Sequence, residues 1–341
     1  MVDSGTLKSG KIIASAVQLE ATTGDVAANL ERAEALCKKA LSSGAKLIAL
    51  PEFFTSRIAF GKEVYKAVLP PENEAVDFLK NLAEKYGCWI GGSMLIADGD
   101  DVYNRYHFVE PDGTTHLHDK DLPTMWENAV YAPGNDTGSF KTNIGGVGAV
   151  VCWELIRTQT IRRLIGKVDV AMTGTHWWTL PDNWGSLIQK TFASIGQYNR
   201  YISENAPSEF ARRLGAPVLQ ASHCGKFKTG FMLIPGLSLS IPYSTEFVGC
   251  TQIVDAYGHI LAHRWAKEGP GIVTAEISLG SVEPLISIGD KFWLTNLPIS
   301  IWLYWHQQNL CSKSYYRRKG KALGLENAKT IKENYRNFFI P

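Results

Sequence analysis

The chain has 341 residues, of which 45% are hydrophobic and 20% are charged, and its formal net charge is +2. This length and composition suffice for one large α/β domain, or two ordinary ones, with a substantial buried core. The nearly balanced charge gives no electrostatic argument for binding nucleic acid, acidic substrates or a membrane surface. We therefore expect no nucleic acid and no membrane as partner.

Six cysteines are spread along the chain without a Cys-x-x-Cys pair. In a chain of this size, that spacing is typical of a reducing compartment and not of a small secreted scaffold stapled by disulfides. Residues 1–20 lack an uninterrupted apolar stretch behind a basic start, which is the pattern of a signal peptide. We therefore expect a cytoplasmic protein.

The first half of the chain alternates strand-like and helix-like segments. A buried strand at 46–50 stops at Pro51, so Glu52 lies just past the carboxyl end of a strand. In open α/β sheets, functional sites collect at such ends. The apolar periodicity predicts helices at 25–41 and 73–86, and strands at 12–19, 46–50, 88–97, 103–110 and 114–118.

The second half continues this alternation. Pro207 predicts a break between two helices, because proline has no N–H to donate within a helix. The expected helices are at 158–165, 184–203 and 208–214, and the expected strands at 147–151, 168–173, 217–221, 249–254 and 272–277. We assign these elements to one domain, residues 10–280.

A C-terminal extension, residues 281–341, is rich in aromatic and then basic residues. Pro298 interrupts its apolar part, which is too short to span a bilayer, since a spanning helix needs about 20 apolar residues. We expect this extension to pack on its own domain or on a partner subunit, away from the chemistry.

Cys152 ends an apolar strand and begins a polar turn, where a thiol can act as a nucleophile. A cysteine attacks a carbonyl or nitrile carbon as its thiolate, so it needs a base or a favourable field. Glu52 is the candidate base. Lys120 and the backbone N–H of Trp153 are the candidates for stabilising the charge that develops on the substrate. One carboxyl group can serve both as base and as acid, so Glu52 could also protonate the leaving nitrogen and activate water.

Three motifs in chain order give the sequence a resemblance to the nitrilase superfamily of carbon-nitrogen hydrolases. They are Leu50-Pro51-Glu52, Lys120 followed by Pro123-Thr124, and Cys152-Trp153-Glu154. The resemblance covers residues 10–280. It implies an α/β fold, a four-layer αββα sandwich that pairs into a homodimer or a higher homo-oligomer.

The resemblance also implies a catalytic triad of Glu52, Lys120 and Cys152 with one additional glutamate. Glu127, seven residues after Lys120, stands at the position of that glutamate. Its expected role is to orient Lys120 or the substrate nitrogen through a charge-assisted hydrogen bond. The motifs are closer to the nitrile-hydrolysing branch than to the aliphatic amidases, but residues 155–157 depart from that branch, in which asparagine usually follows the Cys-Trp-Glu motif.

Several aromatic residues lie near these motifs in sequence and could line an apolar pocket. Of these, we expect Trp126, Trp153 and Trp177 to contact the substrate. His176 beside them either bonds the substrate or satisfies the core.

The sequence therefore predicts a hydrolase that cleaves a non-peptide carbon-nitrogen bond of a small nitrile or amide and releases ammonia and a carboxylic acid. Three alternatives stay open. The activity could be confined to amides, the thioester could be passed to an amine acceptor, or the scaffold could be a non-catalytic binding protein.

Other chemistries find little support. His116 and His118 lack a third ligand at metal spacing, and the glycines at 145–148 precede a strand, unlike a dinucleotide-binding loop. We therefore expect no metal and no cofactor. Cys224 is a rival nucleophile, but the adjacent His223 would point to the opposite face of a strand.

Overall fold

The computed structural model describes residues 10–237 and 239–339. Its helices are α1 (Val26–Ser42), α2 (Glu74–Tyr86), α3 (Thr158–Leu164), α4 (Ser186–Leu214), α5 (Ile299–Tyr315) and α6 (Lys321–Phe339). Short helical turns are η1 (Glu63–Ala67), η2 (Met125–Ala129), η3 (Cys152–Ile156), η4 (Ala266–Glu268) and the π-helical η5 (Tyr316–Gly320).

The strands follow the expected positions to within two residues at each end wherever one was predicted. In chain order they are β1 (Lys11–Leu19), β2 (Leu47–Ala49), β3 (Trp89–Asp98), β4 (Asp101–Val109), β5 (Thr115–Asp119), β6 (Ser139–Thr142), β7 (Gly145–Val151), β8 (Val170–Thr175), β9 (Val218–His223), β10 (Lys226–Met232), β11 (Ser240–Glu246), β12 (Gly249–Val254), β13 (Ile260–Trp265) and β14 (Gly271–Ser278).

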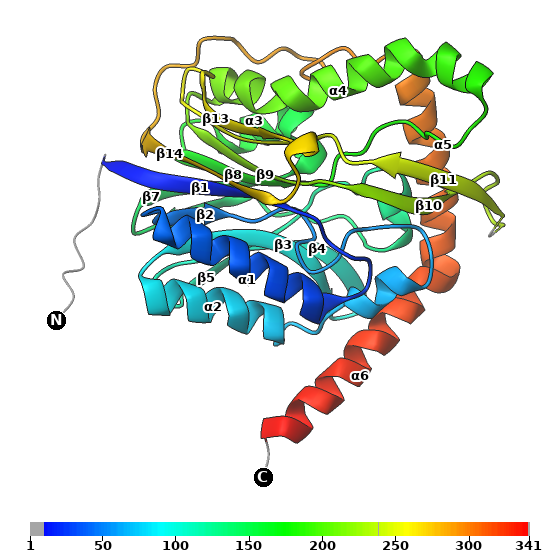
Figure 1. Cartoon of the computed structure of the whole chain (residues 1–341), viewed down its shortest axis with the longest axis horizontal. Helices are drawn as coiled ribbons and strands as arrows, with labels where there is room; N and C mark the ends of the chain where they lie inside the picture. The colour runs from blue at the N-terminus through cyan, green and yellow to red at the C-terminus, as the bar shows by residue number, and fades with distance from the viewer. Residues whose placement is uncertain (1–9, 238, 340–341) are drawn as a thin grey trace.

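Twelve of these strands form one hydrogen-bonded sheet that folds back on itself, while β10 and β11 form a separate hairpin. Strand β1 pairs with β2 in parallel, with β14 in antiparallel and, at its end, with β9 in parallel. The two halves of the sheet face each other, with α1 and α2 covering one outer face and α3 and α4 covering the other (Figure 1). The four-layer αββα sandwich is therefore confirmed.

Alternation along the strands divides the apolar residues between two cores. In and after β2, Leu47 and Ala49 face the core between the sheet halves, whereas Ile48 and Leu50 face α1 and α2. Successive side chains of a strand point to opposite faces, so one short strand contributes to both cores. This arrangement explains why the strand is apolar throughout, and it fixes the position of Glu52 just beyond its end.

Helix α4 corrects the expected break at Pro207, because the helix continues from Ser186 to Leu214 with the proline inside it. Pro207 cannot donate to the carbonyl of Ser203, which costs stability. Apolar residues on both sides of the proline, including Ile202, Ala206 and Phe210, are buried against the sheet. Tertiary packing therefore keeps the helix continuous where the local sequence favours an end.

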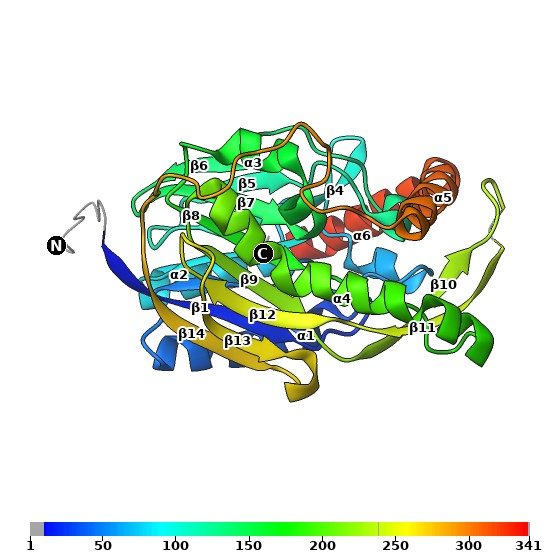
Figure 2. The same ribbon diagram turned by 90° about the horizontal axis from the view of Figure 1, so that it is seen from above.

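The C-terminal helices lie along one end of the sandwich, and the β10–β11 hairpin projects at the same end (Figures 1 and 2). Helix α5 packs on η2, and Ile301, Cys311, Tyr315 and Ala328 join the core between the sheets. In the described part of the chain, no helix has the length and apolar character needed to cross a membrane.

Candidate active site

Four predicted site residues come together between the two halves of the sheet. Glu52 follows β2, Lys120 follows β5, Cys152 follows β7, and Glu127 lies in η2. Each side chain is at most 1% exposed. Three strand ends thus deliver a carboxyl group, an amine and a thiol, and η2 adds a second carboxyl group, at a site shielded from bulk water.

Lys120 bridges the two carboxylates. Its Nζ donates to Glu52 Oε1 at 2.8 Å and to Glu127 Oε2 at 2.7 Å. Glu127 Oε2 also accepts from the backbone N–H of Thr124 at 2.9 Å and from the hydroxyl of Tyr131. These charge-assisted bonds hold the ammonium at a fixed point between its two partners.

The Cys152 thiol lies close enough to the Glu52 carboxylate for each group to shift the pKa of the other, and the backbone of His176 lowers the pKa of the thiol. Cys152 has a φ of 53°, which places it in the left-handed region at the sharp turn between β7 and η3. Phe53 and Met125, in the loops that carry Glu52 and Glu127, share this left-handed conformation. Such strained residues persist where the surrounding structure holds them, and they cluster at active sites.

Burial sets the protonation states of the site. It raises the pKa of Glu52 to about 7, with Lys120 opposing the shift and Glu127 adding to it. Burial and the neighbouring Glu52 also raise the pKa of the Cys152 thiol well above its usual range, while Lys120 lowers it. Burial acts against the Lys120 ammonium, but Glu127 and Glu52 raise its pKa well above the ordinary value. The resting site therefore holds a thiol that needs a base beside it and a lysine that stays charged.

The loop that carries Glu52 is held by groups from three other strands. Asn104 of β4 donates through its side chain to Glu52 Oε1 at 2.8 Å, and its carbonyl accepts from the Lys120 N–H at 3.0 Å. His223 at the end of β9 donates from Nε2 to the Glu52 carbonyl at 2.6 Å. A Cβ on Gly174 of β8 would lie 2.1 Å from the Glu52 nitrogen, so only glycine permits this approach.

Glu154, two residues after Cys152, connects the turn between β7 and η3 to the residues on either side of Lys120. Its Oε2 accepts from the Val151 N–H at 2.7 Å and from His118 Nε2 at 3.0 Å, and its Oε1 accepts from the Asp121 N–H at 3.0 Å. Burial disfavours a charged His118, but Glu154 and Asp136 raise its pKa to about 10. His118 is therefore an imidazolium at neutral pH, and its two carboxylate partners occupy the ring nitrogens that a metal would need.

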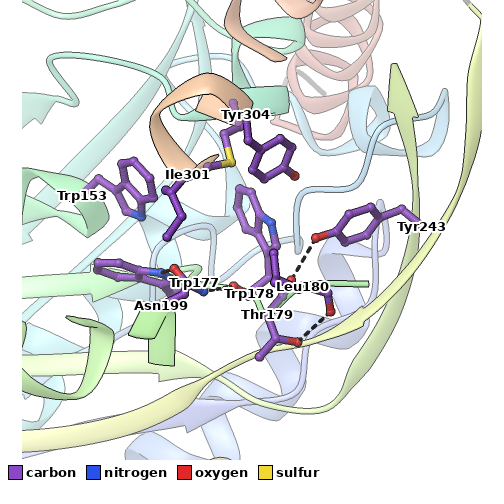
Figure 3. Close-up of a pocket in the computed structure, with 10 residues that line it drawn as sticks. Trp153, Trp177, Trp178, Thr179, Leu180, Asn199, Tyr243, Ile301 and Tyr304 are labelled. Atoms are coloured by element: carbon purple, nitrogen blue, oxygen red, sulfur yellow. Dashed lines mark hydrogen bonds between the residues drawn. The ribbon is translucent and has the colours of Figure 1, made fainter. Parts of the chain in front are cut away.

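A pocket with no charged side chain among the described residues of its wall includes Trp153, the neighbour of Cys152 in the chain (Figure 3). Trp153, directly after Cys152, and Trp177, directly after His176, form part of its wall, as does Met125. The remaining wall consists of Trp178, Thr179, Leu180, Asn199, Tyr243, Ile301 and Tyr304. The pocket has a volume of about 20 Å³, which is room for one water molecule.

Two of the three tryptophans expected at the substrate therefore lie in the pocket wall. Trp126 does not; it is fully buried behind the wall, where its ring stacks on that of Trp178 at a centroid distance of 4.0 Å. His176 Nε2 accepts from the Ile58 N–H at 2.9 Å, whereas no described residue bonds its buried Nδ1. Within the described residues, no group of three or more His, Cys, Asp or Glu side chains could hold a metal ion.

Sequence patterns did not predict that some residues would support the site or line its pocket. Asn104 is one of several polar residues on a strand in which polar and apolar residues alternate. His223 was considered only as a neighbour of Cys224, and not as a support for Glu52. Ile301 and Tyr304 of α5 line the pocket from a segment that was expected to lie away from the chemistry. Their contribution depends on a contact between chain segments more than 100 residues apart, which spacing cannot predict.

Comparison with known proteins shows which family and which curated proteins the chain resembles. The model of the carbon-nitrogen hydrolase family matches residues 13–287. The omega-amidase NIT2 of Danio rerio is 36% identical over 140 residues, which cover 37% of this chain and 50% of that protein. The bifunctional nitrilase/nitrile hydratase NIT4B of Nicotiana tabacum is 29% identical over 307 residues, 82% of each chain. The chain spans about half the length of the first curated relatives that it matches.

Solved structures share the fold. The crystal structure of Saccharomyces cerevisiae Nit3, a member of branch 10 of the nitrilase superfamily, has a TM-score of 0.57 and 22% identity, covering 79% of this chain and 90% of that one. The carbon-nitrogen hydrolase of Helicobacter pylori G27 has a TM-score of 0.60 and 20% identity, covering 78% and 89%. At these identities, the likeness extends to the fold alone.

Proposed function

Because the chain belongs to the carbon-nitrogen hydrolase family, we propose that it hydrolyses the non-peptide carbon-nitrogen bond of a small primary amide, releasing ammonia and a carboxylic acid. One observation carries the proposal: Lys120 Nζ bonds both Glu52 and Glu127, and the buried Cys152 thiol lies close enough to Glu52 and Lys120 for both to shift its pKa. A base, a cation and a nucleophile thus lie together in one buried cluster.

In the first half-reaction, Glu52 takes the thiol proton and the Cys152 sulfur attacks the amide carbon, forming the carbon-sulfur bond. Negative charge moves to the substrate oxygen, where the Lys120 ammonium and the Trp153 N–H stabilise it. The carbon-nitrogen bond then breaks as Glu52 returns its proton to the nitrogen. The products are free ammonia and a thioester on Cys152.

In the second half-reaction, Glu52 removes a proton from water, whose oxygen attacks the thioester carbon. The carbon-sulfur bond breaks, the proton goes back to the sulfur, and the carboxylic acid leaves. A pKa near 7 suits Glu52 to this alternation, because a group that titrates near the working pH both accepts and donates protons readily.

A buried acceptor at Glu127 favours an amide over a nitrile. Glu127 Oε2 receives three hydrogen bonds, whereas no described residue donates to its buried Oε1. An unpaired buried acceptor is costly, and the N–H₂ group of an amide would satisfy it. A nitrile carries no such donor. Relatives named omega-amidase, from Danio rerio and Saccharomyces cerevisiae, also support an amide substrate.

Matched nitrile and amide pairs with the same acyl group test the proposal. Ammonia and acid should appear in equal amounts from the amide, and the nitrile should react more slowly or not at all. Equal or faster turnover of the nitrile would assign the site to nitrile hydrolysis. With an added amine acceptor, we expect the acid to remain the main product; an N-substituted amide in its place would indicate acyl transfer.

Two expectations about the whole protein remain proposals. The family resemblance supports a homodimer or higher homo-oligomer, which light scattering on the full chain would measure. The free cysteines, all six of them buried, support a reducing compartment such as the cytoplasm. Fractionation of cells that express the chain would test the latter.

A further inference from the structure

Beside the uncharged pocket lies a much larger groove, with a volume of about 730 Å³. The groove and the pocket share five wall residues, Thr179, Leu180, Tyr243, Ile301 and Tyr304. The two spaces are therefore adjacent, and the shared side chains separate them. A groove of this size falls in the range of sites for drug-sized ligands, which are much larger than a small amide.

The groove is built by α4 and the loop before it, the β10–β11 hairpin and α5. The hairpin and α5 lie at the same end of the sandwich (Figures 1 and 2). Helix α5 begins at Ile299, outside the region 13–287 that matches the family model. It contributes Ile301 and Tyr304 to the boundary between groove and pocket, and Leu303 to the groove (Figure 3 shows the first two). The C-terminal helix thus gives this chain a wall that the matched family region does not include.

The polarity of the two spaces indicates what they can hold. None of the described residues that line the pocket is charged. The groove contains Asp182 and Arg200, whose side chains are 46% and 40% exposed and pair with Lys226 and Glu246. Between these groups and the triad the walls are mainly apolar or aromatic. A charged group on the acyl side of a short substrate would lose its hydration in the pocket without gaining a partner.

We propose that the groove and the pocket together bind the acyl part of the substrate, and that this part is a long, uncharged apolar chain. The inference rests on the proposed amide hydrolysis, with the amide end at Cys152 and the chain running past Ile301 and Tyr304 into the groove. The side chains of Ile301 and Tyr304 lie between the two spaces, and the proposal requires them to rotate for the chain to pass. The groove has room for a chain of methylenes or a phenylalkyl group, and the proposal requires the smaller pocket to widen when the substrate binds. The mainly apolar walls discriminate against an acyl group that ends in a carboxylate.

A series of straight-chain amides from acetamide to octanamide tests this proposal with the full-length protein. Each added methylene that leaves water should raise kcat/KM about fourfold until the groove is filled. Butanamide should exceed succinamate, which has the same chain length but ends in a carboxylate, by about a hundredfold or more.

A substitution inside the groove provides a second test of the proposal. Gly196 lies on the α4 wall with an ideal Cβ 3.5 Å from Leu180, so Gly196→Trp places a large ring in the groove without touching the triad. The ratio of kcat/KM for octanamide to that for acetamide should fall at least tenfold. Gly289→Trp, at an exposed glycine with open space around it and outside the groove, is the matched control and should keep the wild-type ratio.

The outcomes separate this inference from the proposed function. Ammonia release that is independent of chain length, or greater from succinamate than from butanamide, would overturn the apolar acyl site while leaving amide hydrolysis intact. An unchanged ratio in Gly196→Trp would exclude the groove as the binding place. No ammonia from any amide in the series would overturn the proposed function and this inference with it.

Discussion

Glu52 has a pKa near 7 because burial opposes its charge more than Lys120 supports it. As the base it must be ionised, so kcat/KM should rise with pH and level off above an apparent pKa of about 7. Glu52→Gln should lower kcat by about 10³-fold, since general base catalysis contributes 10²- to 10⁴-fold. A pH profile between 5.5 and 8.5 measures the first effect. An apparent pKa near 4.5 for the acid limb of the kcat/KM profile would contradict the role of Glu52 as the base.

His118 carries its charge for structural reasons and should leave a signature in stability. Its pKa is raised from 6.5 to about 10 in the folded protein, so its contribution is complete below pH 6.5 and is lost as pH rises towards 10. Across this window, the unfolding free energy of the wild type should fall relative to that of His118→Gln by about 1.4 kcal/mol per pH unit. Urea unfolding at pH 6.5, 7.5 and 8.5 measures the difference. Parallel pH profiles for the two proteins would show that the ring is neutral in the fold.

Helix α4 shows how packing overrides a local signal. Replacing Pro207 with alanine restores a hydrogen bond to the carbonyl of Ser203 and adds some freedom to the unfolded chain. The unfolding free energy should rise by about 2 kcal/mol, the balance of the cost of an interior proline and the smaller entropic term. Pro111→Ala is the matched control. Pro111 lies in a turn closed by the Gly113 N–H and the Glu110 carbonyl, so this change should lower stability slightly. Destabilisation by Pro207→Ala would indicate that α4 requires the proline.

Helix α5 supports the Lys120–Glu127 segment through Asn309. Its Oδ1 accepts from the Met125 N–H at 2.9 Å and from the Asn128 side chain at 2.8 Å. Asn309→Ala leaves the buried Met125 N–H unpaired, whereas the Asn128 amide keeps its bonds to the carbonyls of Pro123 and Met125. The change should cost about 1–3 kcal/mol of stability and lower kcat by loosening η2. Lys313→Ala, on the exposed side of the same helix, is the control. Equal kcat values for the two variants would show that α5 does not position the site.

Helix α5 shows a contact that its sequence could not predict, because its buried face is not its apolar face. Its exposed residues include Leu303 and Leu310, whereas Gln308, Asn309 and Ser312 are buried. This is the reverse of the usual pattern, in which apolar residues mark the buried face. Strand β11 was missed for a related reason, because Pro242 within it argues against a strand, yet it pairs with Gly230 in an isolated hairpin.

At the scale of the whole molecule, the sequence predicts those features of the fold and the site that depend on local patterns of residues. Glu52, Lys120 and Cys152 each lie at the end of a strand that periodicity identifies, and the two-sheet fold brings those ends together. The supports of the site, such as Asn104, His223 and Asn309, depend on which side chain faces which across the assembled fold. The pocket wall likewise joins α5 to residues far away in the sequence, so its composition follows from the fold alone.

The central claim is that convergence of these strand ends makes the Cys152 sulfur the nucleophile. The most direct test compares ammonia release from an amide by wild type, Cys152→Ala and Cys224→Ala at equal concentrations of folded protein. Cys224, which is also buried and directly follows β9, is the matched thiol, because the charged groups that shift its pKa are Glu20 and Arg264 and not Glu52 and Lys120. We predict wild-type rates for Cys224→Ala and a loss of at least 10³-fold for Cys152→Ala. Ammonia release by folded Cys152→Ala at the wild-type rate would contradict the account.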